Sequence, residues 1–153
     1  MAEREGARPG RTPARRIERH EQHLAQTYAG FLRELEELGV DHELAPKAIE
    51  SVLCALEQRL VDGEAGHLEA QLPRKVAALL QRCPRHMGRP ARGVNRDDFV
   101  AMVAEDLRCD VNRAEGLTRA VFSAVRNHIS EGEAEEVAIQ LPHDLRVLWA
   151  PYV

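Results

Sequence analysis

Aromatic residues are scarce in this sequence: they make up 4% of its 153 residues, whereas hydrophobic residues as a whole make up 44%. The core must therefore be built mainly from alanine, leucine and valine, a composition that favours helices over strands. The sequence also lacks any apolar run near the roughly 20 residues of a membrane-spanning helix, so we expect no membrane partner. No apolar segment follows the basic N-terminus, as a secretory leader requires. We therefore expect a cytoplasmic protein.

Cysteine is scarce as well. Cys54, Cys83 and Cys109 lie far apart in the sequence. Three cysteines cannot all pair within one chain, and none of them belongs to a Cys-x-x-Cys motif. We therefore expect three reduced thiols.

The sequence does contain an internal repeat with an offset of 69 residues. Pairing residues 32–80 with 101–149 requires no gap and gives 13 identities in 49 positions. The repeat predicts two copies of one unit, packed together as one domain. It divides the chain into a flexible basic tail (1–17), a first helical repeat (18–80), a basic connector containing proline and glycine (81–96) and a second repeat (97–153).

Apolar residues within each unit recur at steps of three and four, which is the spacing of one helix face. This spacing predicts helices over 18–38 and 97–108 and a second, central helix in each unit. Pro46 suits the first turn of one central helix, and Asn112 followed by Glu115 resembles a capping box for the other. Gly39 predicts a left-handed helix end, whereas Arg108 at the matched position predicts that this cap is not shared.

A Gln-Leu-Pro motif occurs in both units. Proline lacks an N–H and disfavours helical geometry in the residue before it, so each motif should end one short helix and open the next. We expect the leucine to fill the gap at this corner and the glutamine to cap exposed backbone groups. The six corner residues are Gln71, Leu72, Pro73, Gln140, Leu141 and Pro142. The fold class that follows is all-α, an eight-helix bundle of two tandem four-helix repeats related by an approximate internal twofold.

These corners follow a Gly-Glu-Ala stretch in each copy, at 63–65 and 132–134. The combination resembles the bacterial and archaeal domain of unknown function family 2267, over nearly all of the chain from about residue 20 onward. The resemblance implies an all-helical domain built from repeats. It transfers no catalytic residue, because the family has no established activity.

Charge is distributed unevenly along the chain. Residues 20–80 and 97–153 each carry 5 basic and 11 acidic side chains, a net charge of −6, whereas the tail and the connector are basic. One interpretation is that these basic segments lie against the acidic units and reduce their self-repulsion. The other is sequence-independent contact with phosphates. The candidate anion contacts in the connector are Arg82, Arg85, Arg89, Arg92 and Arg96.

Three short motifs are candidate metal sites: His20 with His23, Cys83 with His86, and Glu64-x-x-His67, the spacing found in di-iron bundles. A di-iron centre needs the Glu-x-x-His motif twice, and the repeat places Glu136 where His67 stands. We therefore predict no metal and no other cofactor. No nucleophile elbow or phosphate-binding loop is present either, so we predict no enzymatic activity.

These observations favour a non-catalytic helical module that binds another protein, or a second copy of itself, through a groove between its two units. Trp149, Pro151 and Tyr152 are candidates to line or fill that groove. One alternative is a nucleic-acid-associated regulatory protein that uses the arginine-rich tail and connector. A second alternative is an enzyme or metal protein whose site has no recognisable motif.

Overall fold

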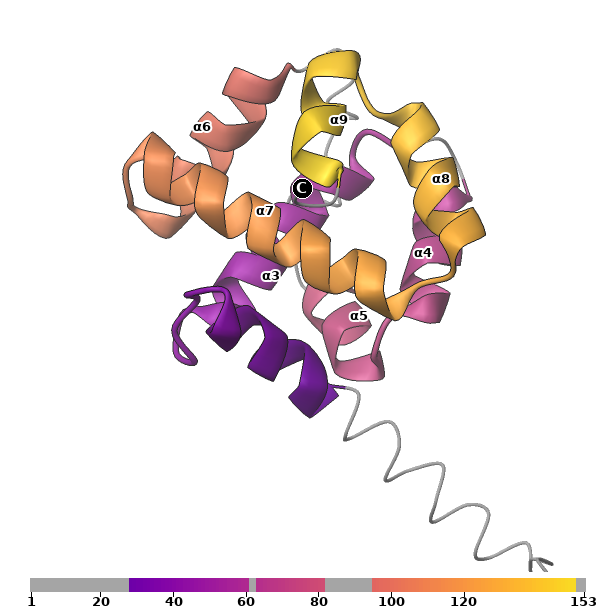
Figure 1. Cartoon of the computed structure of the whole chain (residues 1–153), viewed down its shortest axis with the longest axis horizontal. Helices are drawn as coiled ribbons and strands as arrows, with labels where there is room; N and C mark the ends of the chain where they lie inside the picture. Colours follow the sequence, from indigo (N-terminus) through magenta and orange to yellow (C-terminus); the bar gives the residue numbers. More distant parts are fainter. Residues whose placement is uncertain (1–27, 61–62, 82–94, 151–153) are drawn as a thin grey trace, which may run out of the picture.

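A computed structural model describes residues 28–60, 63–81 and 95–150, which form helices and no strand (Figure 1). The first described helix covers residues 28–37. The helices that follow are α3 (Ala45–Glu57), α4 (Glu64–Gln71), α5 (Arg74–Gln81), α6 (Arg96–Leu107), α7 (Val111–His128), α8 (Glu131–Gln140) and α9 (His143–Trp149). Within these ranges, no helix is long and apolar enough to cross a membrane. The predicted all-α class is confirmed.

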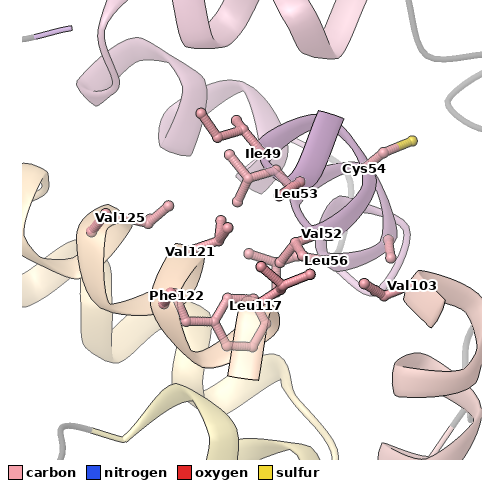
Figure 2. Close-up of a cluster of buried hydrophobic side chains, with 14 of the residues drawn as sticks. Ile49, Val52, Leu53, Cys54, Leu56, Val103, Leu117, Val121, Phe122 and Val125 are labelled. Atoms are coloured by element: carbon pink, nitrogen blue, oxygen red, sulfur yellow. The ribbon is translucent and has the colours of Figure 1, made fainter. Parts of the chain in front are cut away.

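The core lies between the two central helices, α3 and α7, which cross in the middle of the molecule (Figure 1). Figure 2 shows Ile49, Val52 and Leu53 of α3 facing Val121 and other apolar side chains of α7. All of these side chains are fully buried. α6 covers one side of the pair, α5 packs against α3, and α9 packs against α7. Apolar side chains therefore fill the space between the central helices, where the sequence suggested a binding groove.

The Gln-Leu-Pro motifs form the expected corners. Leu72 and Leu141 are extended, with φ/ψ of −89°/158° and −85°/145°, and each follows the last residue of a short helix. Their side chains are only 6% and 3% exposed. The residue before proline leaves the helical region because the proline ring crowds it there. The apolar side chain of each leucine then fills the bend.

Helix ends differ from the sequence prediction at two positions. Arg108 is left-handed (φ 55°), as Gly39 is (φ 94°), so the cap is shared although only one of the two residues is glycine. α7 begins two residues earlier than the Asn112 capping box requires. Its cap is Asp110, whose Oδ1 accepts a hydrogen bond from the backbone N–H of Arg113 (2.7 Å). Aspartate caps as well as asparagine does, so the earlier residue begins the helix.

The cysteines also differ from expectation. Cys54 is buried in α3 and is disulfide-bonded, whereas Cys109 is a free, half-buried thiol. Cys83 lies outside the described residues. The prediction of three reduced thiols is therefore wrong at Cys54. Distance along the sequence does not limit which thiols meet in space, and an odd count permits one bond with one thiol left over.

Candidate functional site

The candidate site is the contact between the short helices α4 and α8, which lie side by side at one edge of the molecule (Figure 1). We call this contact the α4–α8 seam. α4 buries only Glu64 and Leu68, and α8 buries only Glu133 and Val137. Each helix therefore contributes one carboxyl and one aliphatic side chain, four residues apart on the same helix face.

The residues that start α4 and α8 place Glu64 and Glu133 in the first turns of these helices. α4 starts after Gly63, whose φ of 91° is accessible to glycine without strain. α8 starts after Ser130, whose Oγ accepts a hydrogen bond from the backbone N–H of Glu133 (3.1 Å). A second bond joins the two helices, because the backbone N–H of Ser130 donates to Oε1 of Gln71 (2.8 Å). The corner glutamine thus joins the end of α4 to the start of α8.

The two carboxyls of the seam are 92% buried, since Glu64 and Glu133 are each 8% exposed. Burial, the hydrogen bond to Glu64 and then the charge of Glu64 raise the pKa of Glu133 to about 7, with a smaller contribution from Glu136. Two carboxylates cannot hydrogen-bond to each other unless one of them carries a proton. Glu133 therefore gains and loses its proton near neutral pH, and it can hydrogen-bond to Glu64 while that proton is bound.

The seam leaves polar atoms without partners. Oε2 of Glu64 and Oε2 of Glu133 are buried, and neither has a hydrogen-bond partner among the described residues. One neighbour of the pair is His67, whose Nδ1 lies 3.9 Å from Oε1 of Glu64. Its side chain is 74% exposed, so solvent screens any charge that it carries.

A second acidic pair lies nearby, between α3 and α4. Burial, followed by a hydrogen bond with Glu69 and the charge of Glu69, raises the pKa of Glu57 to about 9. Glu57 is only 4% exposed. This region of the fold therefore contains two carboxyl groups that favour the protonated form.

The structure brings together part of one predicted metal motif. Glu64 and His67 are neighbours, and Glu136 acts electrostatically on Glu133. No group of three histidine, cysteine, aspartate or glutamate side chains within 28–60, 63–81 and 95–150 is arranged to hold a metal ion. His20, His23, Cys83 and His86 lie outside those ranges.

Only one of the candidate anion contacts falls within the described residues. Nη2 of Arg96 lies 2.7 Å from Oε1 of Glu115, so its guanidinium is engaged in an ion pair with α7. Its backbone N–H donates to Oδ2 of Asp144 (3.0 Å). The other four, Arg82, Arg85, Arg89 and Arg92, lie outside the described residues.

The C-terminal aromatic residue proposed for the groove is part of the core. Trp149 is 3% exposed, packs edge-on against Phe122 and donates from Nε1 to the carbonyl oxygen of Ala134 (3.1 Å). It therefore fills space and anchors α9 to α8, and it does not line an open groove. Pro151 and Tyr152 lie outside the described residues.

Sequence reasoning missed the pairing of Glu64 with Glu133. Both residues were noted as parts of a repeated motif, and Glu64 also as half of a metal motif. A signal was present, however: each glutamate stands four positions before a buried apolar residue of the repeat, Leu68 or Val137, and so shares the inward face of its helix.

The fold and the seam define an all-helical protein in which polar side chains cap helices and join them, with a buried carboxyl pair between two short helices. The chain belongs to the family described as Uncharacterized conserved protein (DUF2267), whose model matches residues 28–148. This match confirms the resemblance that the repeated motifs suggested. A search of curated proteins found no match.

Proposed function

We propose that the chain is a non-catalytic, cytoplasmic protein-interaction module built from two tandem four-helix repeats related by an approximate internal twofold. A difference between the outer surfaces of the two units supports the interaction role. Ile139 on α8 is 68% exposed and Val147 on α9 is 49% exposed. The residues at the matched positions are Ala70 and Ala78, which are also exposed. At these two matched positions, bulky apolar side chains thus face outward in the second unit only.

The repeat is supported by residues that match in burial at the 69-residue offset. Val52 and Val121 are fully buried, and so are Leu68 and its counterpart Val137. Packing across the units is also similar, although the two contacted aromatic residues, Phe31 and Phe99, are 68 positions apart and not 69. Residues 59 and 128 occupy one repeat position: the His128 ring lies 5.1 Å from the Phe31 ring, and the Arg59 guanidinium lies 4.8 Å from the Phe99 ring. In this proposal, each unit packs its first helix against the central helix of the other.

Charge on α8 indicates the kind of partner. Its exposed acidic residues are Glu131, Glu135 and Glu136, and the helix carries no basic residue. Burying an aliphatic side chain such as Ile139 contributes about 1.5–3 kcal/mol. A partner with an apolar surface flanked by arginine or lysine would bury Ile139, and its positive charges would complement the acidic residues of α8. A second copy of the chain would instead place one acidic helix against another.

The test uses the full chain as bait in native cytosol, followed by calorimetry with the purified captured protein. We expect the double variant I139S/V147S to weaken binding at least about tenfold, which corresponds to the loss of one buried aliphatic contact. The matched variant A70S/A78S changes the corresponding surface of the other unit and should bind normally. Binding should also weaken as salt rises, because the complementary charges are screened.

Two results would overturn this proposal. In one, both double variants bind the captured protein as tightly as the natural chain does, so the apolar residues play no part. In the other, the exposed pair drives only self-association, which sedimentation would show as a concentration-dependent dimer that I139S/V147S abolishes.

A further inference from the structure

We propose that Glu64 and Glu133 form a proton-dependent latch, which holds α4 against α8 when the two carboxyls share a proton and releases them when both ionise. This inference concerns the interior of the protein and does not depend on the partner proposed above. It rests on the burial of both carboxyls, on the small apolar contact beside them and on the absence of a buried cation in the described part of the seam.

The apolar contact in the seam is small. Leu68 and Val137 are the only apolar residues that α4 and α8 bury fully, the two glutamates are the other buried residues, and the partly buried apolar residues are the alanines Ala65, Ala134 and Ala138. In a longer helix pair, several buried aliphatic side chains would hold the contact whatever the charge of one residue. Here the charge state of two of the four buried side chains decides how strongly the helices attract each other.

The groups near the pair do not replace the proton. On α4 the neighbour is the exposed His67, and on α8 it is Glu136, whose charge opposes ionisation of Glu133. The α5 residue Lys75 places its Nζ 5.5 Å from the ring centre of Tyr28, and the other basic residue of that helix, Arg74, is exposed. Glu69, the other carboxylate of α4, bonds to Glu57.

The charged groups of α9 are engaged away from the pair. Nη2 of Arg146 donates to the carbonyl oxygen of Leu141 (3.3 Å). Oδ2 of Asp144 accepts a hydrogen bond from the backbone of Arg96, and His143 is exposed. Because none of these contacts supplies a counter-charge to Glu64 or Glu133, the second negative charge remains uncompensated when the shared proton leaves.

Helix dipoles act in the opposite direction, because both glutamates lie in first turns, where a negative charge is favoured. In the folded protein, burial nevertheless outweighs this effect, as the raised pKa of Glu133, about 7, indicates. The latch therefore changes state near neutral pH. At lower pH the seam is closed, and at higher pH α8 separates from α4, which also breaks the bond between Gln71 and Ser130.

The test measures amide hydrogen exchange of the full chain at about pH 5.5 and about pH 8.5, corrected for the intrinsic pH dependence of exchange, on either side of the transition expected at about 7. As pH rises between these values, we expect the hydrogen-exchange protection of α4 and α8 to fall at least about tenfold relative to that of α3 and α7. A tenfold change is what the release of one proton produces over one pH unit. The fluorescence of Trp149, the single tryptophan, should change over the same range, because its ring bonds to α8.

The variant E133Q should abolish both changes, because a neutral amide can donate to Glu64 at any pH. E64Q provides a second, independent neutral pair if the first variant does not fold. Two controls should retain the transition: E135Q, which alters an exposed glutamate of α8, and H67Q, which removes the exposed imidazole. A transition that persists in both E133Q and E64Q, or no transition in the natural chain, would overturn the proposal.

Discussion

Gly39 and Arg108 end two helices with the same pair of backbone hydrogen bonds. The N–H of Val40 donates to the carbonyl of Leu35, and the N–H of Gly39 donates to that of Glu36. At the offset of 69, Cys109 donates to Ala104 and Arg108 donates to Glu105. Both ends are therefore Schellman motifs, although only one has the glycine that this conformation favours.

Replacing Arg108 by glycine should stabilise the protein. The left-handed conformation costs a residue with a Cβ about 1–2 kcal/mol, and glycine avoids this cost. Glycine is also more flexible in the unfolded chain, which offsets about 0.5–1 kcal/mol of the gain. We expect the free energy of unfolding in urea to rise by about 0.5–1 kcal/mol. R108A, which removes the exposed side chain but keeps a Cβ, should show no comparable gain.

The reciprocal change tests the same argument. A Cβ added at Gly39 has no atom within 4 Å, so any cost of G39A comes from its φ of 94° and not from a clash. The left-handed backbone costs alanine about 1–2 kcal/mol, and the lower freedom of alanine in the unfolded chain offsets about 0.5–1 kcal/mol, so we expect a net loss of about 0.5–1 kcal/mol. If G39A and R108G both leave the unfolding midpoint unchanged, backbone strain at these ends is negligible.

The corner leucines should be important for stability. Leu72 and Leu141 are 6% and 3% exposed, and truncating a buried leucine to alanine costs about 2–5 kcal/mol. We expect L72A and L141A each to lower the free energy of unfolding within this range. I139A, which shortens a side chain that is 68% exposed, should cost less than about 0.5 kcal/mol. A loss that small at both corners would show that the bends do not depend on these leucines.

The repeated apolar pattern predicted the fold well because burial leaves a periodic record in the sequence. Helix order, both corners and the inward residues of α3 and α7 follow from steps of three and four and from the restrictions that proline imposes. The cap at Asp110 was harder to place, because Asp110 and Asn112 both favour a helix start. Nothing in the sequence around Arg108 predicts the left-handed backbone with which α6 ends.

The candidate site was less predictable from the sequence. The spacing of Glu64 and His67 is the same whether the glutamate faces solvent, a metal or another carboxyl. The contact with Glu133 depends on how α4 packs against α8, and residues so far apart in the sequence carry no local signal of that packing. Two features of the sequence indicate a shared environment: the identity of Glu64 and Glu133 at matched positions, and the apolar residue four positions after each of them.

Metal analysis tests the prediction that the chain holds no metal. Protein purified without an affinity tag should contain well under one equivalent of zinc or iron, and a chelator should leave the thermal midpoint unchanged, because a structural metal would contribute folding free energy. Stoichiometric metal that H67Q removes would show that Glu64 and His67 are ligands. E135Q is the appropriate surface control, since it alters an exposed carboxylate of α8 outside the pair.

The raised pKa of Glu57 predicts a dependence of stability on alkaline pH. In the unfolded chain this carboxyl ionises near its ordinary value of 4.5, whereas in the folded protein its pKa is about 9. The folded state therefore binds more protons between these values, so the stability contribution of neutral Glu57 is complete below about 4.5 and is lost as pH rises to about 9.

Between about pH 7 and about pH 9, the ionisation of Glu57 should lower the free energy of unfolding by about 2–3 kcal/mol. In urea titrations at about pH 7 and about pH 9, E57Q should lose less stability than the natural chain by that order of magnitude, because glutamine stays neutral. The control is E50Q, which alters a half-buried glutamate of the same helix and should lose as much stability as the natural chain does. Equal losses in E57Q and the natural chain would mean that Glu57 is already ionised in the folded protein at about pH 7, which would contradict its raised pKa.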